Sequence, residues 1–295
     1  MSNYIQSEND ESLAAELCSP LPPERVIFAY TMNAIAFGFT GIALIPLFSI
    51  LWEILVRGIS GIKPEIFVKT VIDNGFANAI LGTIIMVGIG AVLSIPTGIM
   101  TGIFLAEFGQ TSPIAGIVRF IASILTGVPS IVVGIFAYGV IVLVTKSFSA
   151  IAGGFALAVI MLPVIVLTTE ESLKLIPISQ RLASAALGGT RFQTTSRIVV
   201  AAAIPGITTG ILLAVARAAG ETAPLIFTAL FSFDWSEGLG LLNPTASLPV
   251  LIFNLYNDPD PEKSQLVWTT SIVLLSLILC VSIVSRLVIR QRRIK

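Results

Sequence analysis

The sequence predicts an all-α integral membrane protein with six transmembrane helices. Of its 295 residues, 55% are hydrophobic and 12% are charged, and the mean hydropathy is +0.95, whereas soluble domains are about a quarter charged. Apolar stretches of the roughly 20 residues that a helix needs to cross the hydrocarbon core recur along the chain. These stretches are continuous and rich in Leu, Ile, Ala and Gly, which excludes the alternating strands of a β-barrel.

The expected spans are separated by segments in which charged and turn-forming residues return. A polar tail, residues 1–25, precedes the first span. We expect this tail to be disordered, and because it lacks the apolar core of a signal peptide, the first span is expected to stay as an anchor. Residues 26–290 form the expected membrane domain, and residues 291–295 form a basic tail. The six spans are residues 26–52, 77–106, 120–145, 147–169, 198–216 continuing to 233, and 265–285.

Prolines recur within or at the edges of these spans. A proline inside a helix frees a carbonyl group and favours a kink. Proline and glycine are common in membrane helices, so a single one indicates little. Together they favour broken, closely packed helices around a path. The prolines are Pro46, Pro96, Pro129, Pro163 and Pro205.

The distribution of lysine and arginine predicts that both termini are cytoplasmic. An even number of spans places both termini on one side. With that side inside, eleven basic residues lie in inner segments and five in outer loops, as the positive-inside rule requires. The acidic residues of the N-terminal tail argue the other way, but acidic residues contribute little to this rule.

Several functional classes are excluded by residues that the chain lacks. It has no histidine, and Cys18 and Cys280 lie too far apart in the expected topology to form a disulfide, so a zinc or haem site is not expected. No GxxxxGK[ST] nucleotide loop occurs. An intramembrane hydrolase needs titratable groups at membrane depth, and the spans supply only Arg217 and Glu221. We therefore expect no bound cofactor, no nucleic-acid partner and a surrounding lipid bilayer.

The segment 170–197 is the longest expected inner loop. Pro177 is expected to end one helix, and an amphipathic helix is expected from Ser179 to the Gly188–Gly189 pair. A second helix then leads from Thr190 into the fifth span. A short helix before a glycine turn is suited to docking a soluble partner.

The run RLASAALGGTRFQTTSRIVVAAAIPGI resembles the EAA loop of ABC importer permeases. The glycine and the spacing are kept, whereas leucine stands at the glutamate position and Ala201 at that of the first proline. The resemblance implies a coupling helix at residues 181–190 that seats in an ATPase subunit; the alternative is an ordinary amphipathic connector. The expected coupling residues are Arg181, Leu182, Ala183, Ser184, Gly188, Gly189 and Thr190.

Three further runs, LTGVPSIVVGIFAYG, RAAGETAPLIFTA and SLPVLIF, resemble the permeases of phosphate-specific ABC importers. The resemblance extends over roughly residues 75–285. It implies a type I importer bundle in the bacterial cytoplasmic (inner) membrane. It also implies three partners: a second, homologous permease of PstC type, a dimer of ATPase subunits that holds ATP and Mg, and an external phosphate-binding protein, which would dock on loops such as 234–264.

Arg217 and Glu221 are two charges inside an apolar run. Burying an arginine near the bilayer centre costs about 2.5–3.5 kcal/mol, so such residues usually face the bundle interior and have a role. On a helix from about residue 204 to 230, Arg217 would lie near the midpoint, with Glu221 one turn later on the same face. A guanidinium matches the oxygens of phosphate, and Glu221 would orient it or accept the proton of hydrogen phosphate. The alternative is an ion pair that only neutralises itself.

Three other residues complete the expected pathway. Thr222 and Ser130, near helix breaks, would add neutral hydrogen bonds, and Arg119 would add a cation at the inner end of the third span. The alternative for Arg119 is an arginine that snorkels to the interface.

Alternative functions are a permease for another oxyanion, such as sulfate or molybdate, and a stand-alone channel or membrane enzyme. A channel would not need the docking segment 170–197, and an enzyme would need titratable groups that the spans lack.

Overall fold

The first transmembrane helix is one long element. The computed structural model describes residues 22–236 and 241–292, with side chains to residue 283. Residues up to 53 form one unit and residues from 54 onward a second. Helix α2 (Pro23–Ser60) is longer than its expected span at both ends, and Pro46 lies inside it. The predicted tail therefore ends before residue 23, and its first 21 residues lie outside the described part of the chain.

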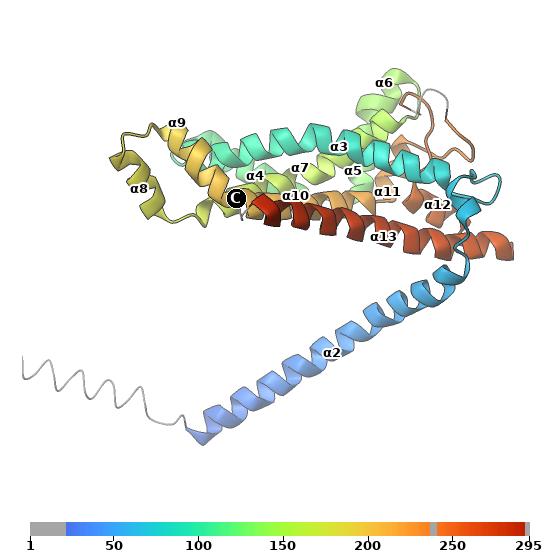
Figure 1. The fold of residues 1–295 in the computed structure, drawn as a ribbon, viewed down its shortest axis with the longest axis horizontal. Coiled ribbons are helices and arrows are strands. Elements are labelled where there is room, and N and C mark those ends of the chain that lie inside the picture. Colours follow the sequence, from blue (N-terminus) through green and yellow to red (C-terminus); the bar gives the residue numbers. More distant parts are fainter. Residues whose placement is uncertain (1–21, 237–240, 293–295) are drawn as a thin grey trace, which may run out of the picture. The chain divides into compact units, whose positions relative to one another are not determined.

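Three long helices form the core of the second unit, α3 (Ala77–Ile103), α7 (Ala150–Lys174) and α10 (Val200–Ala219). In Figure 1, α3, α7 and α10 run along the same direction, and α7 packs against both of the others. The apolar stretch of α7 is 67% buried, against 33% for the α3 span and 28% for the α10 span. Helix α7 is therefore the central helix of this unit.

Small residues allow α3 to approach α7 closely. A Cβ atom on Gly98 would lie 2.7 Å from Cγ2 of Ile165, and one on Gly102 would lie 2.6 Å from Cβ of Thr169. Association of membrane helices depends on such packing, because lipid is as apolar as the side chains. These glycines therefore set the distance between the two helices.

The third span is broken rather than continuous. Its first half is helix α4 (Pro113–Gly127). Its second half begins with α5 (Ser130–Ala137) and continues through η3 (Tyr138–Val142) to α6 (Leu143–Thr145). The two halves meet at an angle of 108°. The residues between them are extended, because a residue before proline avoids the α region. Among the described residues, five helices are long and apolar enough to span a membrane, and the bent pair makes a sixth. The third span, expected at 120–145, is this bent pair, and its break lies at Pro129, one of the prolines that favour broken helices.

The fifth span ends earlier than the sequence predicts. Helix α9 (Arg191–Thr194), the π-helical turn η4 (Thr195–Val199) and α10 form one continuous stretch that stops at Ala219. A separate helix, α11 (Ala223–Thr228), begins with a proline in its first turn. The expected helix over 204–230 is therefore wrong, because the chain breaks at Gly220.

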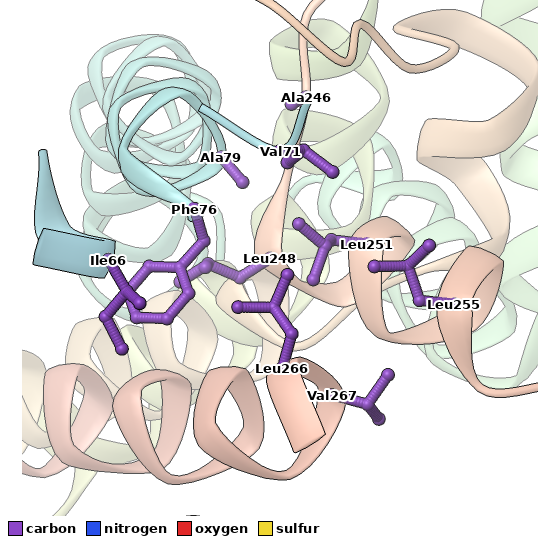
Figure 2. Close-up of a cluster of buried hydrophobic side chains, with 10 residues drawn as sticks. All are labelled: Ile66, Val71, Phe76, Ala79, Ala246, Leu248, Leu251, Leu255, Leu266 and Val267. Carbon is purple, nitrogen blue, oxygen red and sulfur yellow. The ribbon is translucent and has the colours of Figure 1, made fainter. Parts of the chain in front are cut away.

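The end of the second unit opposite α8 (Ile178–Ala186) and α9 holds η1 (Pro64–Phe67), α12 (Leu248–Leu255) and the start of α13 (Pro261–Arg292) (Figure 1). Helix α13 is a membrane-length helix that then runs back along α10. After α12, the Asp260 amide and Lys263 hold the pKa of Asp258 below its usual value. Figure 2 shows the buried cluster that joins these elements to α3, formed by Ile66, Val71, Phe76, Ala79, Ala246, Leu248, Leu251, Leu255, Leu266 and Val267.

Candidate functional site

Arg217 and Glu221 meet at the break between α10 and α11. Arg217 lies in the last turn of α10 and not at a helix midpoint. Its Nε is 3.6 Å from Oε1 of Glu221, and the two side chains are 45% and 16% exposed. This separation is too long for a hydrogen bond, and the guanidinium donates no hydrogen bond to any other described residue. The arginine is thus partly neutralised, while its donors stay available.

Ser130 and Thr222 lie at the starts of two helices that pack together. A Cβ on Gly134 of α5 would lie 2.7 Å from Cα of Pro224 in α11, so the two backbones are in close contact. The Ser149 amide, which follows α6, donates to the Thr228 carbonyl at the end of α11. Helix α11 and the stretch from α5 to α6 therefore run toward the same end. Neither the Ser130 nor the Thr222 hydroxyl bonds to another described residue, so both can meet a ligand.

An open groove lies beside Thr222, and the sequence analysis did not predict it. Asn254 and Asn257 line it, and their amides make no hydrogen bond within the described residues. The available signal was the pair of asparagines in the apolar run LIFNLYN. A different groove, between α3, α10 and α13, is lined almost wholly by apolar side chains and does not suit an anion. The groove beside Thr222 is lined by Thr222, Pro249, Ile252, Phe253, Asn254, Tyr256 and Asn257.

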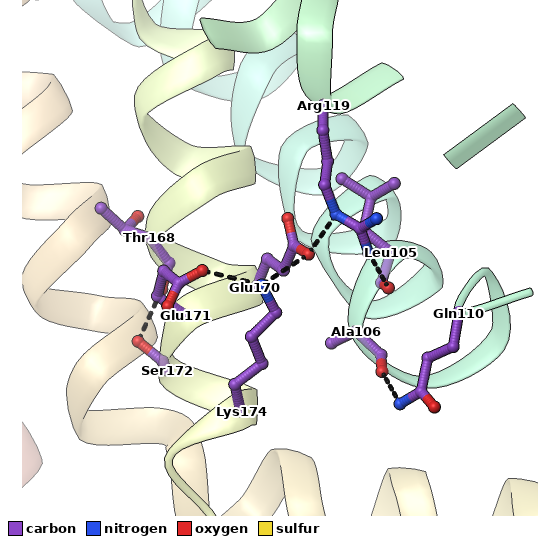
Figure 3. Close-up of polar contacts among 9 residues, drawn as sticks. All are labelled: Leu105, Ala106, Gln110, Arg119, Thr168, Glu170, Glu171, Ser172 and Lys174. Carbon is purple, nitrogen blue, oxygen red and sulfur yellow. Dashed lines mark hydrogen bonds and ion pairs between the residues drawn. The ribbon is translucent and has the colours of Figure 1, made fainter. Parts of the chain in front are cut away.

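Arg119 belongs to a different cluster from Arg217. Its Nε lies 2.6 Å from Oε1 of Glu170, whose side chain is 1% exposed, and it donates to the Leu105 carbonyl at 2.9 Å. Lys174 lies 3.0 Å from the same carboxylate oxygen and 2.8 Å from Glu171. Figure 3 shows Glu170 between the two basic side chains. Arg119 thus ties α4 to α7 and to η2 (Phe104–Phe108).

The segment 170–197 has the helix–turn–helix form that the sequence predicts. Pro177 precedes α8, and Gly188 adopts a φ of +80°, a conformation that favours glycine. Thr190 caps α9 in a capping box with Gln193. Ser184 is buried and its Oγ lies 2.8 Å from Oγ1 of Thr194, which joins α8 to α9.

Apolar side chains project from this segment. Leu182 is 63% exposed and Leu187 is 90% exposed, and Ala183 beside them is also exposed. Gly189 donates its amide to the Ser184 carbonyl and completes the turn. The segment therefore presents an apolar surface on a rigid support.

Glu107 is a site residue that the sequence analysis missed. It lies in η2, at the end of α3, and its carboxylate is 2.7 Å from Arg181 of α8. Arg191 of α9 donates to the Glu107 carbonyl, and its guanidinium lies 5.2 Å from the centre of the Phe108 ring. Helices α8 and α9 are therefore both attached to η2. The only sequence signal was an acidic residue in one short inner loop and basic residues in another inner loop, 170–197.

No group of three or more His, Cys, Asp or Glu side chains among the described residues could hold a metal ion. Helices of membrane-spanning length with one bent pair, an ion pair at a helix break and an exposed helical segment are typical of a membrane-embedded subunit of a transport system. Residues 98–294 match the family described as binding-protein-dependent transport system inner membrane component, and the chain belongs to this family.

Individual relatives extend this match over most of the chain. The phosphate transport system permease protein PstA of Yersinia pestis is 39% identical over 91% of this chain and 90% of its own length. PstA 1 of Mycobacterium tuberculosis strain H37Rv is 35% identical over 88% of this chain and 89% of its own. A chain of the MetNI methionine ABC transporter in an inward-facing form has a TM-score of 0.59 and 17% identity, covering 77% of this chain and 95% of that chain. The structural likeness shows that the fold is that of an ABC importer permease.

Proposed function

We propose that this chain is the transmembrane permease subunit of an ATP-driven phosphate importer. With a second, homologous permease it forms the inward path of inorganic phosphate. The relatives support this function, since proteins named phosphate transport system permeases align with most of the chain. The observation that carries the proposal is the half-exposed guanidinium of Arg217, held 3.6 Å from Glu221 at a helix break.

The geometry suits an anion that must bind and then leave. Guanidinium donors match phosphate oxygens in a bidentate arrangement. Glu221 offsets part of the positive charge, so a passing anion is not held too tightly. Its carboxylate also accepts a hydrogen bond from the proton of hydrogen phosphate, a proton that sulfate lacks. The Thr222 and Ser130 hydroxyls add neutral donors.

The two ends of the second unit support the proposed partners. Leu182 on α8 and Leu187 directly after it are exposed and dock into an ATPase subunit dimer. The dimer holds ATP and Mg, because this chain has no nucleotide-binding loop. Leucine in place of the EAA-loop glutamate makes this contact apolar. The end that carries α8 and α9 is cytoplasmic together with both termini, in line with the basic residues there. An external phosphate-binding protein docks at the opposite end.

The substrate is tested with the full complex in proteoliposomes, together with the binding protein. Wild type is expected to take up labelled phosphate only with internal ATP, and excess sulfate or molybdate is expected not to compete. Uptake of sulfate or molybdate without phosphate would overturn the substrate and leave the importer architecture in place.

A further inference from the structure

The guanidinium of Arg181 joins three elements at the end of the second unit that carries α8. One of its nitrogens lies 2.7 Å from Oε1 of Glu107 in η2 and 3.0 Å from the Leu173 carbonyl in the last turn of α7. Another nitrogen donates to the Ile176 carbonyl just beyond α7. The last carbonyl groups of a helix have no hydrogen-bond partner within the helix. The Arg181 guanidinium donates to carbonyl groups at the end of α7 and also binds the Glu107 carboxylate in η2.

A second arginine holds α9 to the same turn. Arg191 donates to the Glu107 carbonyl, and its guanidinium lies over the ring of Phe108. The hydroxyls of Ser184 and Thr194 join α8 to α9 directly. The two helices that flank the glycine turn are thus fixed to η2 and to each other. Glu107 is the shared partner, and its side chain is 9% exposed.

From this junction the attachment continues to the proposed anion site. Residues 191–219 are one continuous helical stretch that ends with Arg217 in its last turn. Helix α7 packs along α10, where a Cβ on Gly206 would lie 2.5 Å from Oγ of Ser172. A displacement of α8 can therefore reach the break beside Arg217 through the continuous stretch 191–219 and through α7, which packs against α10. Both η2 and η4 are π-helical, a feature that often marks functional positions.

We propose that Glu107 is a positioning residue that couples the ATPase-docking helix α8 to the helices of the phosphate path. Its carboxylate fixes α8, through Arg181, to η2 at the end of α3, so that α8 moves together with the long helices when the partner subunits close. This inference rests on the proposed function. Without the Glu107 charge, α8 could shift under the partner while the rest of the bundle stayed in place.

The measurement is the number of phosphate ions taken up per ATP hydrolysed by the full complex in proteoliposomes. Glu107→Gln keeps the side-chain shape and removes the charge, and Glu107→Asp keeps the charge. The matched control is Glu65→Gln, which removes a carboxylate from an exposed pair with Lys69. In the Glu107→Gln complex the ratio is expected to fall at least about fivefold, the lower end of typical coupling between sites, with ATP hydrolysis retained. The Glu107→Asp complex and the control are expected to stay close to wild type.

Two results would overturn the proposal. The first is a wild-type ratio in the assembled Glu107→Gln complex. If that variant fails to assemble, the Arg181→Lys complex is measured instead. Lysine keeps the charge but cannot reach Glu107 and Leu173 with a planar fork, so the ratio of phosphate to ATP is expected to fall. A wild-type ratio in this complex is the second result that would overturn the proposal. If the wild-type complex takes up no phosphate, the result contradicts the proposed function and not the coupling inference. The coupling inference is then tested by hydrogen exchange of residues 178–186. Glu107→Gln is expected to accelerate this exchange and Glu107→Asp to leave it unchanged. Equal exchange in wild type and both variants would contradict the inference.

Discussion

Arg217 combines a half-exposed guanidinium with a counter-charge that does not occupy its donors. A charged side chain within a membrane-spanning segment is costly, so its presence in this apolar run indicates a role. The 3.6 Å separation from Glu221 gives electrostatic relief without a hydrogen bond. Arg119, by contrast, has its guanidinium taken up by Glu170 and a carbonyl. Of the two arginines, Arg217 is the one whose donors are free for a substrate.

Replacing Arg217 with lysine tests the need for the planar fork. Lysine keeps the charge but acts as a point donor, and one lost hydrogen bond to a charged group is worth about 1.5–3 kcal/mol. We expect the Arg217→Lys complex to assemble and its phosphate uptake to fall at least about tenfold, which matches the lower figure. The readout is ATP-dependent uptake, and undiminished uptake would show that charge alone suffices.

At the scale of elements, the breaks position the site. The 108° bend between α4 and α5 and the interruption between α10 and α11 place Ser130, Thr222 and Arg217 at helix ends instead of in regular turns. The close contact of Gly134 with Pro224 keeps α5 and α11 together. The long helices around α7 supply the rigid frame.

The α3–α7 contact is expected to fail when a methyl group is added at Gly102. Its Cβ would lie 2.6 Å from Cβ of Thr169 and 2.9 Å from the Val166 carbonyl, so backbone has to move. Overpacking of this kind costs about 1–3 kcal/mol, and the thermal midpoint of the detergent-solubilised complex is expected to drop for Gly102→Ala. Gly88→Ala, in the same helix with open space around its Cβ, is the control and is expected to be neutral or slightly stabilising.

The start of α9 is expected to depend on the Thr190 cap. Its hydroxyl accepts from the Gln193 amide and the Gln193 side chain accepts from the Thr190 amide. Loss of an N-cap costs about 1 kcal/mol, so Thr190→Ala is expected to accelerate hydrogen exchange in residues 191–194. Thr190→Ser, which keeps the hydroxyl, is expected to restore protection; equal exchange in both variants would show that the cap is not needed.

At the scale of the molecule, the second unit has two functional ends joined by the long helices (Figure 1). One end carries α8, α9 and the two ion-pair clusters, and the other carries α12 and the groove beside Thr222. Membership in the family of binding-protein-dependent transport components fits this division. In the proposed function, one end meets the ATPase subunits and the other the binding protein.

This orientation predicts opposite labelling of two exposed positions. In a protein with Cys18 and Cys280 replaced by alanine, Asn257→Cys is expected to react with a membrane-impermeant maleimide in intact cells. Thr111→Cys, on the turn between η2 and α4, is expected to react only after the membrane is opened. The reverse pattern would place the termini outside.

Hydropathy was sufficient to predict the spans, because transfer to lipid depends on composition over about 20 residues. It could not predict where a span breaks: the apolar run continues past Gly220, whereas the helix stops at Ala219. Local signals at Pro177, the glycine pair and Thr190 did predict α8 and α9. The pairing of Glu107 with Arg181 joins residues far apart in sequence and depends on how α3 and α7 pack, so no local pattern contained it.

The measurement that tests the central claim most directly is phosphate uptake by the full complex carrying Arg217→Gln or Glu221→Gln. Both variants are expected to assemble and to hydrolyse ATP, while uptake collapses because the path has lost either its anion-binding group or the group that permits release. Uptake that survives both changes would show that the two charges serve the structure alone and would contradict the assignment of this helix break to the phosphate path.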